Sequence, residues 1–238
     1  MARKNIDGVV VVGLGRFGRS LALELTKEGV EVLGVDSDPR VVRSLAGRLT
    51  HVVEADSTDL EAMRELGVAE FDRAVVGVGT NLEASILSAS VVLELGVRHV
   101  WSKAISQSHA RILDQIGVHH VVRPEHDMGK RVAHLVTGRM IEYIEFDDGY
   151  AFAKTRPPRA LIGRSLAGFG VRQEYGVTIV GVKAAGEDFT YATPSTVLRD
   201  GAEIIVSGPK DKVERFSALG DEGGAGPRTE RRTPRPTW

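Results

Sequence analysis

A short glycine-rich segment near the N-terminus has the spacing of a phosphate-binding loop. It reads Gly13-Leu14-Gly15-Arg16-Phe17-Gly18 and matches the pattern G-x-G-x-x-G. The apolar run Val9–Val12 precedes it and an amphipathic stretch follows it, which is the strand–turn–helix context that the pattern requires. The first glycine permits a tight turn, the second lets the backbone approach a pyrophosphate, and the third lets the helix pack closely on the strand. The helix N-terminus then offers unpaired N–H groups to phosphate, so the segment predicts a nucleotide site.

Asp36 has the position of a ribose-binding carboxylate. It follows the apolar run Val32–Val35, eighteen residues after Gly18, where an acidic residue accepts hydrogen bonds from an adenosine ribose. A carboxylate at this position repels a 2′-phosphate, so NADP-type ligands are disfavoured. The alternative interpretation of an acidic residue in this turn is a solvated carboxylate, and it applies to Asp38, which precedes Pro39.

Further polar residues follow the third and fourth expected strands. Asp56 and Ser57 come after the third, and we expect Asp56 either near the adenine or as the cap of the next helix. Gly79 and Asn81 lie in the loop after the fourth. The carboxyl edge of an open parallel sheet is where such folds bind ligands, so we include all four residues in the candidate site.

The elements that must position these residues alternate regularly between strands and helices. The expected strands are Val9–Val12, Val32–Val35, His51–Val53, Ala74–Val76, His99–Trp101 and His119–Val122. The expected helices are Arg16–Glu28, Arg40–Arg48, Leu60–Leu66, Asn81–Leu95 and Ser108–Ile116. This alternation predicts an α/β fold with a Rossmann-like, doubly wound parallel sheet.

The pattern changes after Pro124. We expect a helix over residues 125–137, strand-like alternation over 141–154, a turn at Arg156–Arg159 and a short helix over Leu161–Arg172. Strands at Val177–Lys183 and Glu203–Val206 and a closing helix at Lys210–Leu219 complete a second, small α+β domain. The predicted domains are 1–138, including the helix 125–137, and 139–219. The tail 220–238 is rich in glycine, proline and arginine and is expected to be disordered.

Composition excludes several classes of protein. The chain has 31 basic and 32 acidic residues among 238, so a net charge of −1 argues against whole-chain attraction to nucleic acid. Cysteine is absent, which excludes disulfides and cysteine metal sites and fits a reducing compartment. No apolar run approaches the ~18 residues of a membrane span, and the N-terminus is interpreted as a first strand rather than a signal peptide. We therefore expect a cytoplasmic protein.

The sequence predicts no catalytic residue. All seven histidines fall before residue 135, and Tyr175 and Lys183 in the second domain have no supporting constellation for proton transfer. The run Glu125-His126-Asp127 suggests a metal, but neighbouring residues of a helix point in different directions and three of them cannot converge on one ion. The alternative interpretation is that these residues form the polar start of a helix, where the helix dipole favours acidic side chains.

Together these motifs resemble a known family, the RCK (regulator of K⁺ conductance) proteins, and within it the cytoplasmic gating subunits of Ktr/Trk-type potassium uptake systems. The resemblance covers about residues 8–219. Besides the glycine segment and Val35-Asp36, it rests on the following segments: Ala55-Asp56-Ser57-Thr58, Trp101-Ser102-Lys103-Ala104, Ile116-Gly117 and Arg123-Pro124-Glu125-His126-Asp127-Met128-Gly129.

The resemblance implies how such a protein is built and what it binds. It implies homodimers, linked by the crossover helix 125–137, that assemble into an octameric ring on a membrane-embedded potassium channel or transporter at the inner face of the membrane. It implies ATP or ADP in each N-terminal domain, and NAD or NADH in some relatives. Arg16 matches an arginine that reaches the terminal phosphate, and a guanidinium beside a helix N-terminus suits a polyphosphate. Lys103 matches a lysine near the phosphates, and Glu125 an acidic residue that helps hold Mg²⁺ or another divalent cation beside a neighbour's nucleotide.

The second domain resembles the C-terminal RCK subdomain, which binds cyclic di-AMP in some members. Arg172 is positioned to contact a phosphate, although a surface salt bridge explains it equally well. Val171 lies at a matching position too, and Val177, Ile179 and Pro194 would form an apolar wall.

Our main hypothesis is a nucleotide-sensing regulatory subunit without enzymatic activity. The alternative is an NAD-dependent oxidoreductase or an NAD(H) redox sensor, which the same glycine loop and Asp36 support. A redox-sensing DNA-binding regulator needs a basic recognition helix, and the C-terminal arginines lack helical periodicity. No nucleic-acid partner is therefore expected.

Overall fold

The computed structural model describes residues 6–79, 81–138, 140–146 and 148–220. The chain divides into two compact units, and the division falls between His126 and Asp127. Our predicted boundary lies twelve residues later, after 138, because we assigned the whole of the helix 125–137 to the first domain. The predicted disordered tail lies outside the described residues, apart from Gly220.

The first unit is built on a six-stranded parallel sheet in the order β3-β2-β1-β4-β5-β6. The strands are β1 (Ile6–Val12), β2 (Glu31–Asp36), β3 (His51–Glu54), β4 (Phe71–Val76), β5 (His99–Lys103) and β6 (His120–Val122). Val9–Val12 of β1, Val32 and Val35 of β2, and Ala74–Val76 of β4 are buried, as expected for strands that are covered on both faces. The predicted doubly wound parallel sheet is confirmed.

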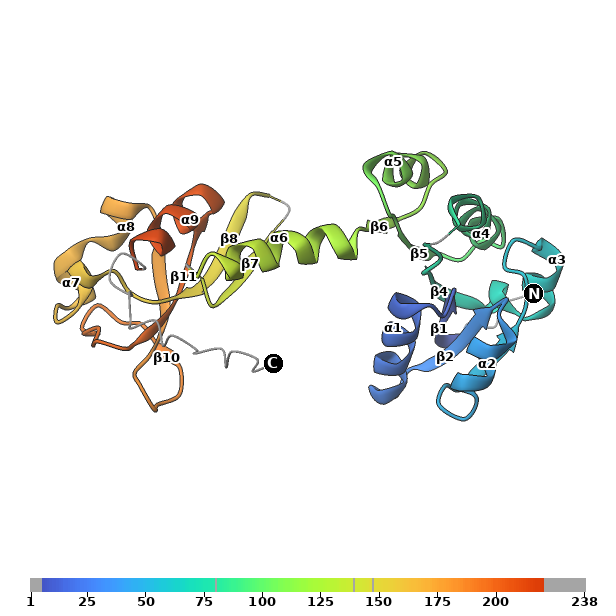
Figure 1. The fold of residues 1–238 in the computed structure, drawn as a ribbon, viewed down its shortest axis with the longest axis horizontal. Helices are drawn as coiled ribbons and strands as arrows, with labels where there is room; N and C mark the ends of the chain where they lie inside the picture. Colours follow the sequence, from blue (N-terminus) through green and yellow to red (C-terminus); the bar gives the residue numbers. More distant parts are fainter. Residues whose placement is uncertain (1–5, 80, 139, 147, 221–238) are drawn as a thin grey trace, which may run out of the picture. The chain divides into compact units, whose positions relative to one another are not determined.

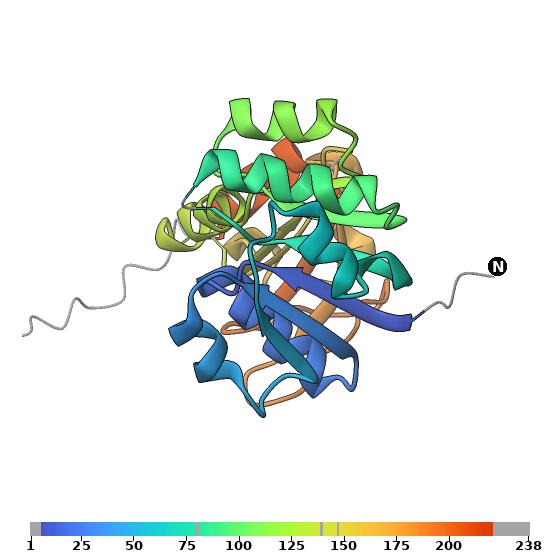
Figure 2. The ribbon, with the colours of Figure 1, turned by 90° about the vertical axis from the view of Figure 1, so that its right-hand side faces the viewer.

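Helices cover both faces of this sheet, as Figures 1 and 2 show. They are α1 (Arg16–Lys27), α2 (Pro39–Leu45), α3 (Leu60–Glu65), α4 (Leu82–Glu94) and α5 (Gln107–Gln115), with a 3₁₀ turn over Val68–Glu70. Ala22 of α1 and Leu45 of α2 pack on one face with Val9 and Val11. The other face carries α3, α4 and α5, which pack against the alternate residues of β1. The sheet is therefore packed between two apolar layers, one on each face.

The order of the strands creates a switch point between β1 and β4. The chain leaves β1 toward β2 and β3 on one side and then returns to β4, β5 and β6 on the other. Gly13 follows β1 and Gly77 follows β4, and Gly77 N–H bonds the carbonyl of Val12 at 2.7 Å. Ligands of open α/β sheets bind at this point, beyond the carboxyl ends of the strands.

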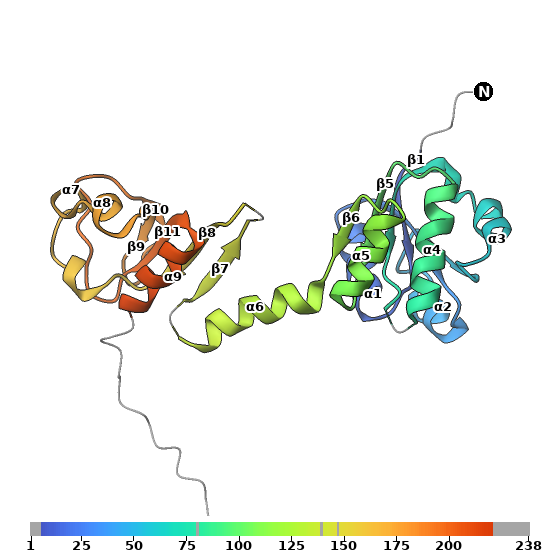
Figure 3. The same cartoon turned by 90° about the horizontal axis from the view of Figure 1, so that it is seen from above.

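The second unit contains a five-stranded antiparallel sheet in the order β10-β9-β11-β8-β7. The strands are β7 (Glu142–Glu145), β8 (Tyr150–Thr155), β9 (Thr178–Lys183), β10 (Thr190–Tyr191) and β11 (Glu203–Pro209). The helices are α7 (Leu166–Phe169), α8 (Val171–Tyr175) and α9 (Lys210–Leu219), with a 3₁₀ turn over Arg159–Leu161. The helix α9 lies against β8 and β11 (Figure 3) and buries Val213 and Phe216 in the core. The predicted small α+β domain is confirmed.

The helix α6 (Pro124–Val136) spans the division between the units. None of its described residues is buried. It begins at Pro124, one residue before the predicted start, because proline suits the first position of a helix. Within the described ranges, no helix combines the length and the apolar character that a bilayer crossing requires.

Three predictions for the second unit were wrong in detail. Residues 141–154 form two strands, because the chain turns back before Tyr150 and pairs Tyr143 with Ala153. The helix expected over Leu161–Arg172 is divided, since Gly170 adopts a left-handed conformation with φ of +58° between α7 and α8. The two-residue strand β10 lies in the turn-rich segment that carried no strand pattern.

Candidate functional site

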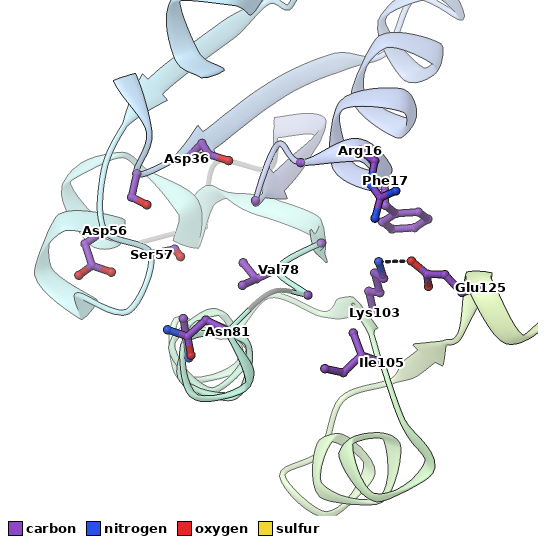
Figure 4. Close-up of a pocket in the computed structure, with 16 residues that line it drawn as sticks. Arg16, Phe17, Asp36, Asp56, Ser57, Val78, Asn81, Lys103, Ile105 and Glu125 are labelled. Carbon is purple, nitrogen blue, oxygen red and sulfur yellow. Dashed lines mark hydrogen bonds and ion pairs between the residues drawn. The ribbon is translucent and has the colours of Figure 1, made fainter. Parts of the chain in front are cut away.

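A cleft of about 640 Å³ lies at the carboxyl edge of the parallel sheet, at its switch point. Figure 4 shows that its two ends differ in charge: Asp36, Asp56 and Ser57 lie at one end, whereas Arg16, Phe17, Lys103 and Glu125 lie at the other. The glycine turn after β1 and the loop after β4 form the part between them. The lining residues are Gly13, Gly15, Arg16, Phe17, Asp36, Ser37, Asp56, Ser57, Gly77, Val78, Gly79, Asn81, Ala84, Lys103, Ile105 and Glu125.

The glycines of the turn are required by its geometry. Gly13 has a φ of +81°, and a Cβ there would lie 2.9 Å from the backbone nitrogen of Val78. A Cβ on Gly18 would overlap the carbonyl oxygen of Gly13, so only glycine permits α1 to start this close to β1. A Cβ on Gly15 would meet nothing within 4 Å and would enter the open cleft. Gly13 and Gly18 therefore serve the turn and the packing, as the sequence predicts, and the role of Gly15 toward a pyrophosphate stays a prediction.

Asp36 is fixed at the acidic end by two backbone donors. Leu14 N–H donates to Asp36 Oδ2 at 2.6 Å, and Asp38 N–H donates to Oδ1 at 2.9 Å. Each oxygen of a carboxylate has two lone pairs, so both retain acceptor capacity toward the cleft. Asp38 does not line the cleft; it caps α2 by accepting from Arg40 N–H at 2.8 Å. Hydrogen bonds from the Arg40 side chain are the main reason that the pKa of Asp38 is lowered to about 2.

Asp56 lines the cleft and is not the cap of the following helix. Its Oδ1 accepts from Thr58 N–H at 2.9 Å, and this bond is the main reason that the pKa of Asp56 is lowered. The cap of α3 is Asp59, which accepts from Glu61 N–H and Ala62 N–H. Of our two interpretations of Asp56, the cap is therefore wrong. Its place at the acidic end agrees with the other one.

Two further polar residues of the cleft have partners in α4. Ser57 Oγ and Ser88 Oγ are 2.7 Å apart and share a hydrogen bond. Asn81 caps α4, because its Oδ1 accepts from Ala84 N–H at 3.1 Å. Both side chains are therefore positioned by the secondary structure around them.

The cationic end is organised around Lys103. This residue ends β5, and its ammonium forms an ion pair with Glu125, with Nζ 2.6 Å from Oε1. The ammonium also lies 5.9 Å from the centre of the Phe17 ring, within the range of a cation–π contact. The hydrogen bond from Lys103 is the main reason that the pKa of Glu125 is lowered, with a smaller contribution from Arg16. This end offers two positive groups and one carboxylate.

No group of three His, Asp or Glu side chains converges on a common point in the described part of the chain, so these residues alone do not build a metal site. Glu125 is paired with Lys103, and one carboxylate provides too few ligands for a divalent cation. A cation at Glu125 would take its remaining ligands from phosphate, water or another subunit.

Most of the predicted nucleotide-binding residues line this one cleft. Two do not: Leu14 is buried beneath the turn and contributes its N–H to Asp36, and Gly18 is buried against Gly13. The prediction omitted Ser37, Gly77, Val78, Ala84 and Ile105. Ser37 and Ile105 each lie just beyond the carboxyl end of a strand, β2 or β5, and that position is the signal that identifies them.

A second cavity, of about 510 Å³, lies in the second unit. Arg172 lines it, and Arg172 Nε donates to Thr178 Oγ1 at 3.1 Å, which is a contact with a neutral side chain. All five residues predicted for a second ligand line this cavity: Val171, Arg172, Val177, Ile179 and Pro194. The other lining residues are Leu166, Ala167, Gly170, Gln173, Thr178, Ala192 and Thr193.

The fold and the cleft define a class: a protein with a Rossmann-type nucleotide cleft joined to a small antiparallel domain. Residues 9–124 match the TrkA-N domain family, and residues 154–219 match the TrkA-C domain family. The chain is 36% identical over 207 residues to the Ktr system potassium uptake protein C of Bacillus subtilis (strain 168), covering 87% of this chain and 94% of that protein. It is 33% identical over 221 residues to the Ktr system potassium uptake protein A of the same organism, covering 92% and 100%.

Solved structures agree in fold. The crystal structure of the GsuK RCK domain has a TM-score of 0.61 and 18% identity, and covers 96% of this chain and 50% of that chain. The GsuK channel bound to NAD has a TM-score of 0.60, also with 18% identity, and covers 96% and 41%. This chain therefore spans at most about half of each of those chains. It belongs to the RCK proteins of the Ktr/Trk potassium uptake family, as the sequence motifs predict.

Proposed function

We propose that this chain is the nucleotide-sensing regulatory subunit of a potassium uptake system and that it has no catalytic activity. The observation that carries the proposal is the polarity of the cleft. Asp36 at one end suits a ribose, and Arg16 and Lys103 at the other suit a chain of phosphates, with Gly15 open between them. The names of its relatives, Ktr system potassium uptake proteins A and C, supply the process that such a site would regulate.

ATP and ADP are the ligands that we assign to this cleft. The terminal phosphate of ATP would bind Arg16 at the cationic end. ADP lacks this phosphate and would leave part of the positive charge at that end without an anionic partner. Such sensing gates a partner only if the two ligands favour different conformations, because a ligand that binds both conformations equally shifts nothing. Lys103 and Glu125, two groups capable of proton transfer, are paired with each other, which favours binding over catalysis.

NAD(H) is the alternative ligand. Asp36 is an acceptor suited to the ribose of NAD, and the GsuK channel, a structural neighbour, is described as bound to NAD. An NAD(H) redox sensor or an NAD-dependent oxidoreductase would use the same glycine turn. The two cations at the phosphate end favour the mononucleotide polyphosphate in our proposal.

A homodimer, with α6 as its crossover helix, is the assembly unit that we propose, and an octameric ring of such dimers is the complete assembly. Met128, Val132 and Val136 recur every fourth residue of α6 and are exposed, so one apolar stripe of the helix is available to a second copy. Glu125 would then approach a neighbour's nucleotide and help bind Mg²⁺ or another divalent cation together with its phosphates. The ring would dock on a membrane-embedded potassium transporter at its cytoplasmic face, without nucleic acid.

Cyclic di-AMP is the ligand that we propose for the second cavity. Arg172 provides a cation for a phosphate, and Val177, Ile179 and Pro194 provide an apolar wall for a base. The Thr178 hydroxyl orients the guanidinium from one side.

Calorimetric titration of the full chain with ATP, ADP, NADH and cyclic di-AMP, with and without Mg²⁺, tests these assignments. We expect tight binding of ATP and ADP, with a preference that changes with Mg²⁺, and independent binding of cyclic di-AMP. Tight NADH binding without ATP binding would replace the proposal with a redox sensor, and substrate-dependent reduction of NAD would replace it with an oxidoreductase.

A further inference from the structure

The Lys103–Glu125 pair joins two elements of unequal exposure. Lys103 ends β5, which lies between β4 and the edge strand β6, and 11% of its side chain is exposed, whereas 64% of the Glu125 side chain is exposed in the first turn of α6. The ammonium lies beside Gly79, where a Cβ would be 3.3 Å from Nζ. The buried partner is therefore held inside the cleft, and the exposed partner reaches it from the rim (Figure 4).

The pair lies at the cationic end of the cleft, the end to which the proposed function assigns the phosphates of the ligand. Arg16 and Phe17, which line the same end, come from the first turn of α1, the helix whose N-terminus faces the glycine turn. The other described carboxylates of the cleft, Asp36 and Asp56, lie at the opposite end. A phosphate that enters the cationic end thus meets one competing anion, the carboxylate of Glu125.

We propose that the Lys103–Glu125 ion pair is a latch that nucleotide binding opens: a phosphate of the ligand takes over Lys103, and Glu125 is released from β5. This inference rests on the proposed function, because it requires a nucleotide in the cleft. Burial decides which partner leaves. A buried ammonium without a counter-charge is costly, so Lys103 keeps an anion throughout, whereas an exposed carboxylate returns to water at little cost.

The release of Glu125 changes the start of α6. In the pair, the first turn of α6 is tied by its side chain to the end of β5, and β5 carries the ligand-binding lysine. When the latch opens, that tie is lost and the first turn is held by its backbone alone. Binding of a nucleotide in the cleft therefore leaves the first turn of α6 less constrained. It also exposes a free carboxylate, which is the group that we assign to cation binding.

The test uses the full chain without divalent cations, in EDTA, with ATP as the ligand. Binding is measured by calorimetry, and the freedom of α6 by hydrogen exchange of the amides of residues 128–130. In the unmodified chain we expect ATP to speed exchange in this segment. In Glu125→Gln the segment should exchange quickly without ATP and change little on binding. The affinity for ATP should rise about two- to fivefold, since the phosphate no longer has to displace the Glu125 carboxylate from Lys103.

Glu145→Gln is the matched control. Glu145 pairs with Lys210 at 2.8 Å in the second unit, and its loss should leave both the ATP affinity and the exchange of α6 unchanged. Weaker ATP binding by Glu125→Gln would overturn the latch, because Glu125 would then be positioning Lys103 for the ligand. ATP binding with unchanged exchange in α6 would also overturn it, while leaving the proposed function intact. If the unmodified chain does not bind ATP, the proposed function falls and the latch with it.

Discussion

Leu14 and Asp36 are joined by a 2.6 Å hydrogen bond from the backbone N–H of one to the carboxylate of the other. This bond ties the glycine turn after β1 to the end of β2. The carboxylate that we assign to the ribose and the turn that we assign to the phosphates are therefore held at a fixed separation before any ligand arrives. Preorganisation of this kind lowers the conformational cost of binding.

Asp36→Ala should weaken both the fold and the site. Leu14 N–H and Asp38 N–H lose their acceptor, so the free energy of unfolding should fall by about 1–3 kcal/mol. The ribose also loses its acceptor, so binding of ATP, ADP and NADH should weaken together. Denaturant unfolding and calorimetry measure the two effects. Asp38→Ala is the control: it removes the cap of α2 and should lower stability while preserving nucleotide affinity. Unchanged affinity in Asp36→Ala would argue against the ribose assignment.

Gly18→Ala and Gly15→Ala should separate packing from ligand binding. The new Cβ at Gly18 overlaps the Gly13 carbonyl, so this variant should lose about 1–3 kcal/mol of unfolding free energy. At Gly15 the Cβ meets nothing, so Gly15→Ala should fold normally and bind ATP more weakly, because the methyl group enters the phosphate path. Thermal unfolding and ATP titration of both variants are the measurements. Equal ATP affinity in Gly15→Ala and the unmodified chain would contradict a phosphate at this turn.

Arg16→Ala should reduce discrimination between ATP and ADP. If the guanidinium contacts the terminal phosphate, its loss should weaken ATP binding about tenfold and ADP binding much less. Arg19→Ala, on the same helix, is a suitable control because Arg19 bonds Ser44 and does not line the cleft. Competition titrations give both constants. An unchanged ratio of ATP to ADP affinity would show that Arg16 does not sense the third phosphate.

Arg172→Ala should abolish most cyclic di-AMP binding without affecting ATP. Loss of a charged hydrogen bond to phosphate predicts about a tenfold weaker affinity. Arg215→Ala is the control, because Arg215 pairs with Asp211 on α9 and lies outside the second cavity. Calorimetry with both ligands distinguishes the cavities. Cyclic di-AMP binding that survives in Arg172→Ala but disappears in Gly15→Ala would place that ligand in the first cleft instead.

The first unit was predictable because its signals are local. Strands such as β1 are short apolar runs, and helices such as α1 carry a periodic apolar stripe, so the order of strands and helices follows from residues such as Val9–Val12 and Leu21. The glycine pattern then fixes which strand comes first. In an open parallel sheet, every loop that follows a strand lies at one edge, so the sequence predicts that Asp36, Asp56 and Gly79 share one site, and all three line the cleft.

The second unit was less predictable because its structure depends on pairing. The alternation over 141–154 is equally compatible with one long strand and with a hairpin, and only the pairing of Tyr143 with Ala153 distinguishes them. The short strand β10 has two residues, and it is stabilised by its neighbour β9 rather than by its own sequence pattern.

The sequence by itself determined the class of the cleft, because three glycines at fixed spacing and a carboxylate eighteen residues later encode backbone shape and charge locally. Only the tertiary structure decided how side chains pair. Lys103 and Glu125 are 22 residues apart in the sequence. Their side chains meet because β5 ends and α6 begins at the same edge of the sheet. Such a contact depends on the packing of both elements, and no local pattern in the sequence records it.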